Sequence, residues 1–263
     1  MTNKLEPIER RKRRDPEIKV WDRFVRVHHW LLVLAFATAY LEYKKFPLHP
    51  YAGYLISILI TARIVWGFVS KGAARFSAFS YRPDEMLAYC RDALAGKASY
   101  YYSHNPMGAA MVYALLATLF VTCLLGLLSY SASQQLGPFG ALIPDTWEDK
   151  LIGAHTLGGH LLAILVACHL GGVIWAAWLH RENYVLAMLT GLRRIPRAIP
   201  LPPGAKHPEK PGTAPAFIRT LVVWLNFKRP FVGTLLLMLL IICLLVLPVI
   251  HFLVGINKML PAY

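Results

Sequence analysis

One apolar stretch constrains this chain more than any other feature, because it is long enough to cross a bilayer and carries three histidines. It runs from Leu151 to Leu179 and reads LIGAHTLGGHLLAILVACHLGGVIWAAWL. His155 and His169 are fourteen residues apart, about 40° short of four full helical turns, so both imidazoles leave the same helix face. They sit roughly 21 Å apart along the axis, near opposite edges of a hydrocarbon core about 30 Å thick. This layout predicts two sites, one per leaflet, whereas His160 points about 180° away from His169.

Apolar blocks of membrane-spanning length recur along the 263 residues, of which 56% are hydrophobic and only 16% are charged. They cover about residues 25 to 43, 51 to 69, 107 to 130, 150 to 179 and 230 to 254. Each block is close to the length of about 20 residues that crosses a hydrocarbon core. The sequence therefore predicts an all-α integral membrane protein, with a four-helix transmembrane bundle in membrane lipid and a fifth C-terminal transmembrane helix.

The basic residues lie mostly between these blocks, and their numbers alternate from one segment to the next. Nine Lys and Arg residues occur up to Arg26, two at 44–45, five in 70–105, one in 131–150, nine in 180–229 and one after the fifth block. Segments rich in Lys and Arg stay in the cytoplasm, so we expect a multi-pass protein with its N-terminus cytoplasmic and its C-terminus periplasmic. The same placement explains the net charge of +14 without nucleic acid, which we exclude as a partner.

The segments around the four central blocks define the expected domain boundaries. We expect a basic cytoplasmic tail over 1–20, a four-helix transmembrane domain over 21–182, a proline-rich cytoplasmic linker over 183–229 and a C-terminal transmembrane helix over 230–263. The linker is expected because seven prolines fall between residues 195 and 215, a composition typical of extended connections. Residues 83–96 combine a proline-acidic start with apolar residues at helical spacing, which predicts a short helix on the membrane surface.

Histidines at matching depths in three blocks form two candidate pairs. His49 stands at the outer end of the second block, at the depth of His155, and His29 stands at the inner end of the first block, at the depth of His169. Two imidazoles that face each other across the helices of a bundle hold a haem iron by two axial ligands. Zinc would need further Cys, His or carboxylate ligands, which neither pair supplies in an obvious way. The alternative is four separate histidines, each bonded only to a neighbouring helix.

Three further residues on the cytoplasmic side are candidates for contact with a quinone or a haem propionate: His28, Arg63 and His104. His28 points about 100° away from His29, so only one of the two faces the bundle interior. Arg63 lies near the cytoplasmic end of its block, where the charge is costly unless it has an anionic partner or snorkels to the headgroups. His104 precedes a helix start and is either a donor to a quinone carbonyl or an ordinary interfacial cap residue.

Three segments together resemble the bacterial cytochrome b561 and nickel-hydrogenase cytochrome b-type subunit family of diheme membrane cytochromes: WDRFVRVHHW, HPYAGYLISILITARIVWGF and HTLGGHLLAILVACH. The resemblance covers about residues 20 to 182 and implies a cytochrome b-type domain holding two haem b groups. It implies iron ligation by the histidine before Trp30 and by three others, giving the axial ligands His29, His49, His155 and His169. The haems are expected to be non-covalent, since the four cysteines form no CxxCH motif. The doubling His28-His29 and the fifth block depart from the family pattern.

The resemblance also implies electron transport in a respiratory chain of the bacterial inner (cell) membrane. Such a protein carries electrons between the quinone pool and a redox partner, such as a periplasmic c-type cytochrome or a hydrogenase- or dehydrogenase-type subunit. We expect an electron-transfer subunit rather than a self-contained oxidoreductase, because the chain has no catalytic nucleophile or acid–base constellation. The alternatives are a superoxide:quinone oxidoreductase-like enzyme and a non-redox proton-coupled transporter whose intramembrane histidines relay protons.

Overall fold

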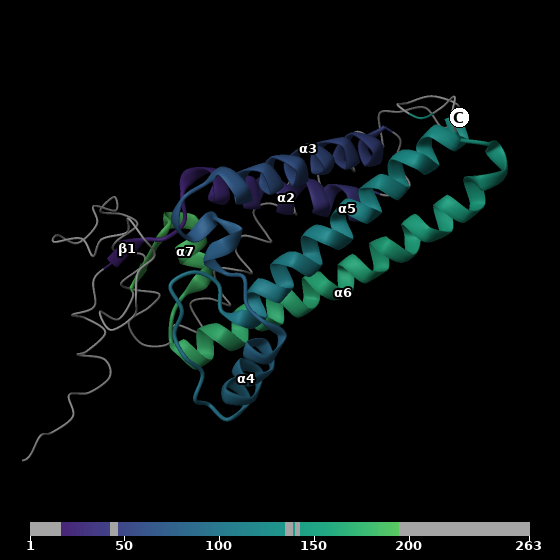
Figure 1. Ribbon diagram of the computed structural model, residues 1–263. Helices are drawn as coiled ribbons and strands as arrows, with labels where there is room; N and C mark the ends of the chain where they lie inside the picture. The colour runs from purple at the N-terminus through teal and green to yellow at the C-terminus, as the bar shows by residue number, and fades with distance from the viewer. Residues whose placement is uncertain (1–16, 43–46, 135–138, 140–142, 195–263) are drawn as a thin grey trace, which may run out of the picture. The chain divides into compact units, whose positions relative to one another are not determined.

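Four long helices dominate the computed structural model, which describes residues 17–42, 47–134, 139 and 143–194 (Figure 1). They are α2 (Arg23–Leu41), α3 (Leu48–Val69), α5 (Pro106–Gln134) and α6 (Glu148–His180). By length and composition, all four can cross a membrane, which confirms the four predicted central spans and a multi-pass membrane protein. The predicted fifth span, 230–254, lies outside the described residues.

Side-chain caps fix where several helices begin. Asp22 accepts a hydrogen bond from the backbone nitrogen of Val25 at 2.8 Å and so caps α2. Asn105 accepts one from the backbone nitrogen of Gly108 at 2.7 Å, and Pro106 occupies the first position of α5. A single 3-10 turn, η3 (Asp145–Trp147), precedes α6, and two acidic residues in the first turn of α6 favour its N-terminus.

The described chain divides into two compact units. The first, which we call the bundle unit, comprises residues 27–65 and 110–172 and holds most of the four long helices. Its core is a cluster to which every one of these helices contributes: Ala35, Ile56, Ile60, Leu119 and Leu162. Within this unit α5 and α6 lie side by side along most of their length (Figure 1).

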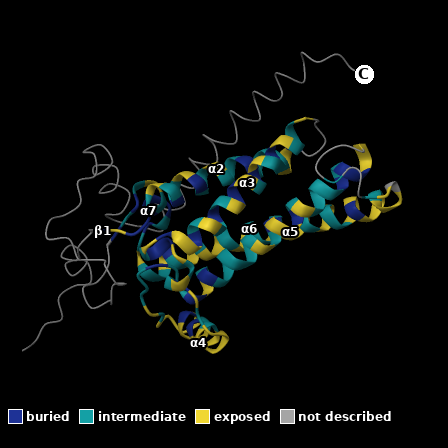
Figure 2. Cartoon of the chain, turned by 45° about the horizontal axis from the view of Figure 1, so that its top comes forward, coloured by how far each residue is buried: buried dark blue, intermediate teal, exposed yellow. Residues whose placement is uncertain are grey.

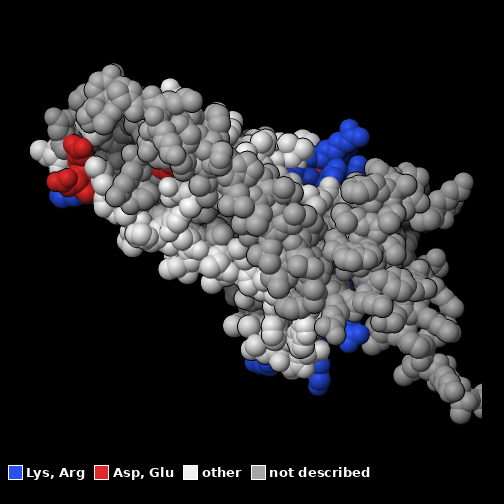
Figure 3. Space-filling view, turned by 180° about the vertical axis from the view of Figure 1, so that it is seen from behind, with Lys and Arg blue, Asp and Glu red and all other residues white. Residues whose placement is uncertain are grey.

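Much of the surface of the long helices is apolar and exposed. Ile58 of α3 is 65% exposed and Phe120 of α5 is 52% exposed, and exposed residues follow the helices in Figure 2. Little of the described surface in Figure 3 carries Lys, Arg, Asp or Glu. Exposed apolar side chains on helices of spanning length are typical of contact with lipid.

The second unit, which we call the mixed unit, contains one end of each long helix and every described short element except η3. In the described residues it covers 17–26, 66–109 and 173–194. Its short elements are the strands β1 (Glu17–Lys19) and β2 (Leu192–Arg194), the 3-10 turns η1 (Gly72–Ala74) and η2 (Phe76–Ala78), and the helices α4 (Pro83–Leu94) and α7 (Tyr184–Thr190). Helix α4 confirms the helix predicted over 83–96, whereas α7 and the two strands were not anticipated.

Strands β1 and β2 pair antiparallel, with Ile18 opposite Arg193. The pairing continues into the turn, because Gly191 accepts hydrogen bonds from the backbone nitrogens of Val20 at 2.8 Å and Trp21 at 3.2 Å. Gly191 ends α7 with a φ of 82°, and a Cβ atom there would lie 2.6 Å from the carbonyl oxygen of Trp21. Only glycine satisfies both the left-handed backbone and this close approach.

Candidate functional site

The structure brings His49 of α3 and His155 of α6 together. Their ring centroids are 5.7 Å apart and the ring planes are almost perpendicular, at 87°. Metal–imidazole bonds are about 2.0–2.1 Å long, as zinc sites show. The two rings are therefore near neighbours, at a separation slightly shorter than the ~6.4 Å expected for two imidazoles bonded in line to one metal ion.

Backbone hydrogen bonds fix the tautomer of both rings. The Nδ1 atom of His49 lies 2.8 Å from the carbonyl oxygen of Ala39, and Nδ1 of His155 lies 2.9 Å from that of Thr122. A carbonyl oxygen only accepts, so each Nδ1 is the donor and carries the proton. Each Nε2 then keeps a lone pair, which is the arrangement of a metal-binding imidazole held by a second hydrogen bond.

The carbonyl groups of Ala39 and Thr122 are both accessible to the histidine rings. Ala39 lies in the last turn of α2, where helix carbonyls lack an intrahelical partner. The Thr122 carbonyl points along α5 towards residue 126, four positions later. Residue 126 is glycine, and a Cβ atom there would lie 2.9 Å from Cε1 and 3.0 Å from Nδ1 of His155. Gly126 therefore makes room for the His155 ring against α5, a role that sequence analysis missed because this span has no histidine.

The inner pair, His29 and His169, also meets within the bundle unit, close enough for the two rings to interact electrostatically. The Nδ1 atom of His29 is buried and makes no hydrogen bond with any of the described residues. A buried nitrogen of this kind is costly unless another group occupies it. The inner pair thus has an unsatisfied ring nitrogen where the outer pair has an orienting hydrogen bond.

His28 and Arg63 are both buried in the bundle unit, at 6% exposure each. The Nε2 atom of His28 lies 2.9 Å from the carbonyl oxygen of Leu59 in α3, so this nitrogen is engaged in a bond between α2 and α3. Arg63 is close enough to His28 for their charges to interact. The two residues therefore form one polar region of the bundle unit.

His104 lies in the mixed unit, on the segment before α5. Its ring centroid is 4.9 Å from that of Trp21 and 4.6 Å from that of Phe79. The backbone carbonyl of His104 accepts a hydrogen bond from the hydroxyl of Tyr81 at 2.8 Å, and its Nδ1 is 3.4 Å from the hydroxyl of Ser103. His104 is thus half-buried among aromatic rings, and the hydroxyl of Tyr81 holds its backbone carbonyl.

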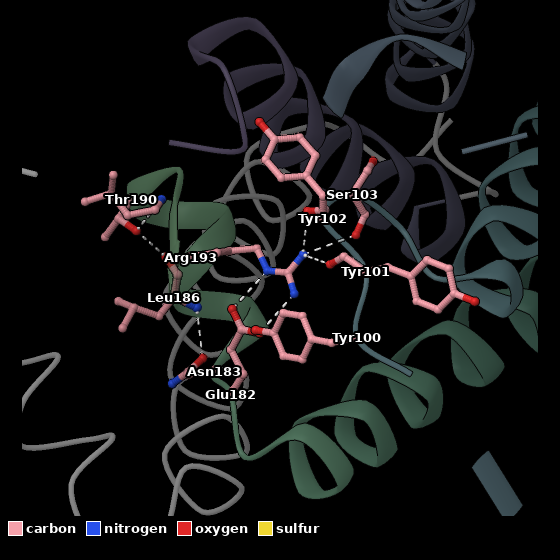
Figure 4. A network of polar contacts seen from close by, with 10 residues as sticks. Tyr100, Tyr101, Tyr102, Ser103, Glu182, Asn183, Leu186, Thr190 and Arg193 are labelled. Carbon is pink, nitrogen blue, oxygen red and sulfur yellow. Dashed lines mark hydrogen bonds and ion pairs between the residues drawn. The ribbon is translucent and has the colours of Figure 1, made fainter. Parts of the chain in front are cut away.

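A buried ion pair between Arg193 and Glu182 contacts the segment before α5 (Figure 4). Arg193 donates from Nε and Nη2 to the two carboxylate oxygens of Glu182, each at 2.9 Å. Its Nη1 donates to three successive carbonyl oxygens, those of Tyr101 at 3.3 Å, Tyr102 at 3.0 Å and Ser103 at 3.1 Å. One guanidinium therefore ties the residues after α6 to the residues before α5. Sequence analysis missed it, because Arg193 resembles every other basic residue of a linker.

Aromatic hydroxyls surround this ion pair. Tyr100 donates a hydrogen bond to Glu182, and the Arg193 guanidinium lies 5.0 Å from the ring centroid of Tyr184. Burial, followed by the charge of Glu182, raises the pKa values of Tyr100 and Tyr184. Burial also raises the pKa of Tyr89 to about 12. The tyrosines are therefore neutral donors near neutral pH.

In the part of the chain that the structure describes, no three His, Cys, Asp or Glu side chains gather in a way that would hold a metal ion. The histidine pairs remain the candidate iron ligands. Where only two protein ligands face each other, a haem supplies the remaining four through its macrocycle. Two neighbouring imidazoles that carry their protons on Nδ1 and keep a lone pair on Nε2 are a donor set that fits that group.

Four helices of membrane length, with facing imidazoles between them, define an integral membrane protein of the b-type cytochrome class. Residues 20–191 match the family model described as prokaryotic cytochrome b561. The chain belongs to this family, and it is a membrane b-type cytochrome of electron transfer that binds haem b. No curated protein and no solved structure matches the chain in the same comparisons.

Proposed function

We propose that this protein is a diheme cytochrome b that carries electrons across the bacterial inner membrane between the quinone pool and a periplasmic redox partner. The observation that carries the proposal is the geometry of His49 and His155, whose rings face each other with both Nδ1 atoms bonded to backbone carbonyls. Both Nε2 atoms then keep the lone pairs that ligation of one haem iron would use. His29 and His169 are the proposed ligands of a second haem.

Each ligand pair spans two helices, so the helices and not the loops set the distance between the rings. A haem bound by two imidazoles supplies one-electron transfer without an open coordination position. The Ala39 and Thr122 carbonyls hold the outer rings in orientation and increase their basicity. Gly126 keeps α5 close enough for the second of these hydrogen bonds.

Quinone exchange is proposed on the cytoplasmic side, with His28, Arg63 and His104 as candidate contacts. A quinone needs polar groups at its carbonyls and a source of protons, and a propionate needs a cation. The burial of His28 and Arg63 in one polar region supports such a role, since buried ionisable groups in membrane helices are commonly functional. The half-buried position of His104 against Trp21 and Phe79 supports its candidacy separately.

The proposed partner is a periplasmic c-type cytochrome or a hydrogenase- or dehydrogenase-type subunit. The proposed topology places the N-terminus in the cytoplasm and the start of α6 at the periplasm, because Lys and Arg dominate the opposite segments. Glu148 and Asp149 in the first turn of α6 would then face the partner, where acidic groups steer basic proteins.

Haem stoichiometry and ligand substitution test the proposal. A pyridine haemochrome assay on protein purified with sufficient haem is expected to give two haem b per chain. His49→Ala and His155→Ala are each expected to remove one haem and to leave the spectrum of the other. One haem per wild-type chain would contradict the pairing, and loss of both haems from a variant that no longer folds would be recognised by its altered helix content.

Redox assays separate this function from its alternatives. In membrane vesicles, the proposed protein exchanges electrons both with the quinone pool and with the periplasmic partner. Quinone reduction driven by superoxide in the absence of any partner would instead identify a superoxide:quinone oxidoreductase-like enzyme. Membranes without reducible b-type absorption bands would leave the proton-coupled transporter as the remaining function.

A further inference from the structure

His160 is an imidazole on the outer surface of the bundle unit at membrane depth. The side chain is exposed in α6, and the described residues offer it no hydrogen bond. It lies five residues from the middle of the apolar stretch Leu151–Leu179, or about 7.5 Å along the helix, well inside a hydrocarbon core about 30 Å thick. A polar side chain facing lipid at this depth is costly, and such residues usually pair with one another or with backbone carbonyls.

The partner of His160 has to come from outside the described bundle. Gly158 faces α5, because a Cβ atom there would overlap Thr122, and Leu162 is buried in the bundle core at 3% exposure. Two residues turn an α-helix by about 200°, so His160, midway between Gly158 and Leu162, points away from both. It also lies about 180° from His169, which places it outside the haem-facing side of α6.

The residues around His160 form a continuous exposed stripe, which we call the His160 face. They repeat at the three- and four-residue spacing of a packed helix pair: Gly153, Leu157, His160, Ile164, Ala167 and Gly171. Leu157 is 69% exposed and Ile164 is 61% exposed. A Cβ atom at Gly153 or Gly171 would meet nothing within 4 Å. Small residues interspersed with larger ones let a second membrane helix approach closely.

We propose that two copies of this chain pair through the His160 face, with their His160 side chains hydrogen-bonded across a two-fold axis. Two copies inserted in the same direction are related by an axis along the membrane normal, which brings each residue to the depth of its own counterpart. A neutral imidazole has one donor and one acceptor nitrogen. A second copy therefore supplies a complementary polar group at the depth of His160, where one is needed.

The chain's own fifth apolar block is less suited to this position. Its sequence between residues 230 and 254 is PFVGTLLLMLLIICLLVLPVIHFLV, and its polar residues Thr234 and His251 fall close to the ends of the block. Between them, only Cys243 has a polar side-chain group, and thiols are weak hydrogen-bonding partners. The symmetric pair thus satisfies His160 better than this block does, and the inference depends neither on haem number nor on quinone.

Cysteine cross-linking of the full chain in native membranes tests the proposed pair. Cys90, Cys123 and Cys168 are replaced by Ala, Cys243 is kept, and Ala167→Cys is added on the His160 face. A short bismaleimide is expected to give a dimer for this variant. The matched controls are Ile58→Cys on α3 and Phe120→Cys on α5, which are exposed on other helices of the bundle unit and are expected to give little dimer.

Three outcomes would overturn the proposal. The first is equal dimer yield from the Ala167→Cys chain and the controls. The second is an intramolecular link between residues 167 and 243, which would place the fifth block on the face. The third is a link to a protein of different size, which would identify a partner subunit. Absence of any dimer, when a monofunctional maleimide still labels residue 167, would also exclude the pair.

The hydrogen bond itself is tested by His160→Leu and His160→Asn in chains labelled for energy transfer and diluted in lipid vesicles. His160→Leu is expected to weaken dimerisation roughly 3- to 20-fold, the range that corresponds to one interhelical hydrogen bond. His160→Asn keeps a donor and an acceptor and is expected to restore most of the affinity. The haem spectrum serves as the folding control. Unchanged affinity of the Leu variant would overturn the His160 contact.

Discussion

His28 and His29 are adjacent in α2 but have different surroundings. His28 is bonded through Nε2 to the Leu59 carbonyl of α3. In the described part of the chain, the buried Nδ1 of His29 makes no hydrogen bond, and the His29 ring lies near His169. Because Nε2 of His28 is engaged with the Leu59 carbonyl, only its Nδ1 could bind a metal, whereas His29 already lies near its proposed partner His169. The surroundings thus favour His29 as the inner ligand and give His28 the task of joining two helices.

Substitution of each histidine distinguishes these tasks. His29→Ala is expected to abolish the inner haem, while His28→Ala is expected to retain it and to lower stability by about 1–3 kcal/mol, because the Leu59 carbonyl loses its buried donor. The measurement is haem content with the thermal unfolding midpoint. Loss of the inner haem in His28→Ala alone would move the ligand assignment by one residue.

The close approach of Gly126 to the His155 ring can be tested by adding a methyl group. Gly126→Ala introduces a methyl group 2.9 Å from the His155 ring, so the ring must shift and its bond to Thr122 must lengthen. We expect a changed midpoint potential and spectrum of the outer haem only. Gly159→Ala is the matched control on α6, since a methyl group there meets nothing within 4 Å. Identical spectra of the two variants would contradict the role of Gly126.

At the scale of secondary-structure elements, Arg193 links the segment that follows α6 to the segment that precedes α5. Its guanidinium is 3% exposed and holds Glu182 together with three carbonyl groups. Arg193→Met leaves the Glu182 charge without its cation and is expected to destabilise the mixed unit by about 3–5 kcal/mol. Replacing both partners, as in Arg193→Met with Glu182→Leu, is expected to recover part of this loss. Differential scanning calorimetry measures both effects, and additive losses would contradict the coupling.

Helix α4 contributes a pH dependence through Tyr89. Its pKa is raised from about 10 to about 12, by burial first and then by Tyr101. Below pH 10 the hydroxyl is protonated in both folded and unfolded chains, so its contribution to stability is complete. Between about pH 10 and 12 only the unfolded chain ionises, and stability falls as the pH rises. Tyr89→Phe is expected to reduce this alkaline loss, measured by unfolding midpoints across that range, and an unchanged slope would contradict it.

Elements differ in how far sequence predicts them. The long helices follow from hydropathy, and the start of α5 follows from Asn105 and Pro106, because both signals are local. The depth rule also anticipated that His49 and His155 would meet. The hydrogen bonds from His49 and His155 to the carbonyls of Ala39 and Thr122 could not be predicted from sequence, because every residue has a backbone carbonyl. Strands of three residues are too short for an alternating pattern, and α7 differed from a linker only by its cap, Asn183, and by Gly191.

Membrane orientation is a property of the whole molecule that labelling measures. Ser99 and Ser133 are both exposed and fall in segments that the charge distribution assigns to opposite sides. In intact cells, an impermeant maleimide is expected to label Ser133→Cys in a chain whose other cysteines are replaced, and to label Ser99→Cys only after the membrane is opened. The reverse pattern would invert the topology and move the proposed quinone region to the periplasm.

The pairing of β1 with β2 has a consequence for biosynthesis. Glu17 is opposite Arg194, so the first strand leaves the ribosome long before its partner exists. At about 5–20 residues per second, the interval is roughly 9–35 s, during which all four described long helices are synthesised. The sheet and the Ile18, Val20 and Trp21 side chains packed beside it can form only at the end of this interval. Assembly of this part of the mixed unit is therefore a late event in synthesis.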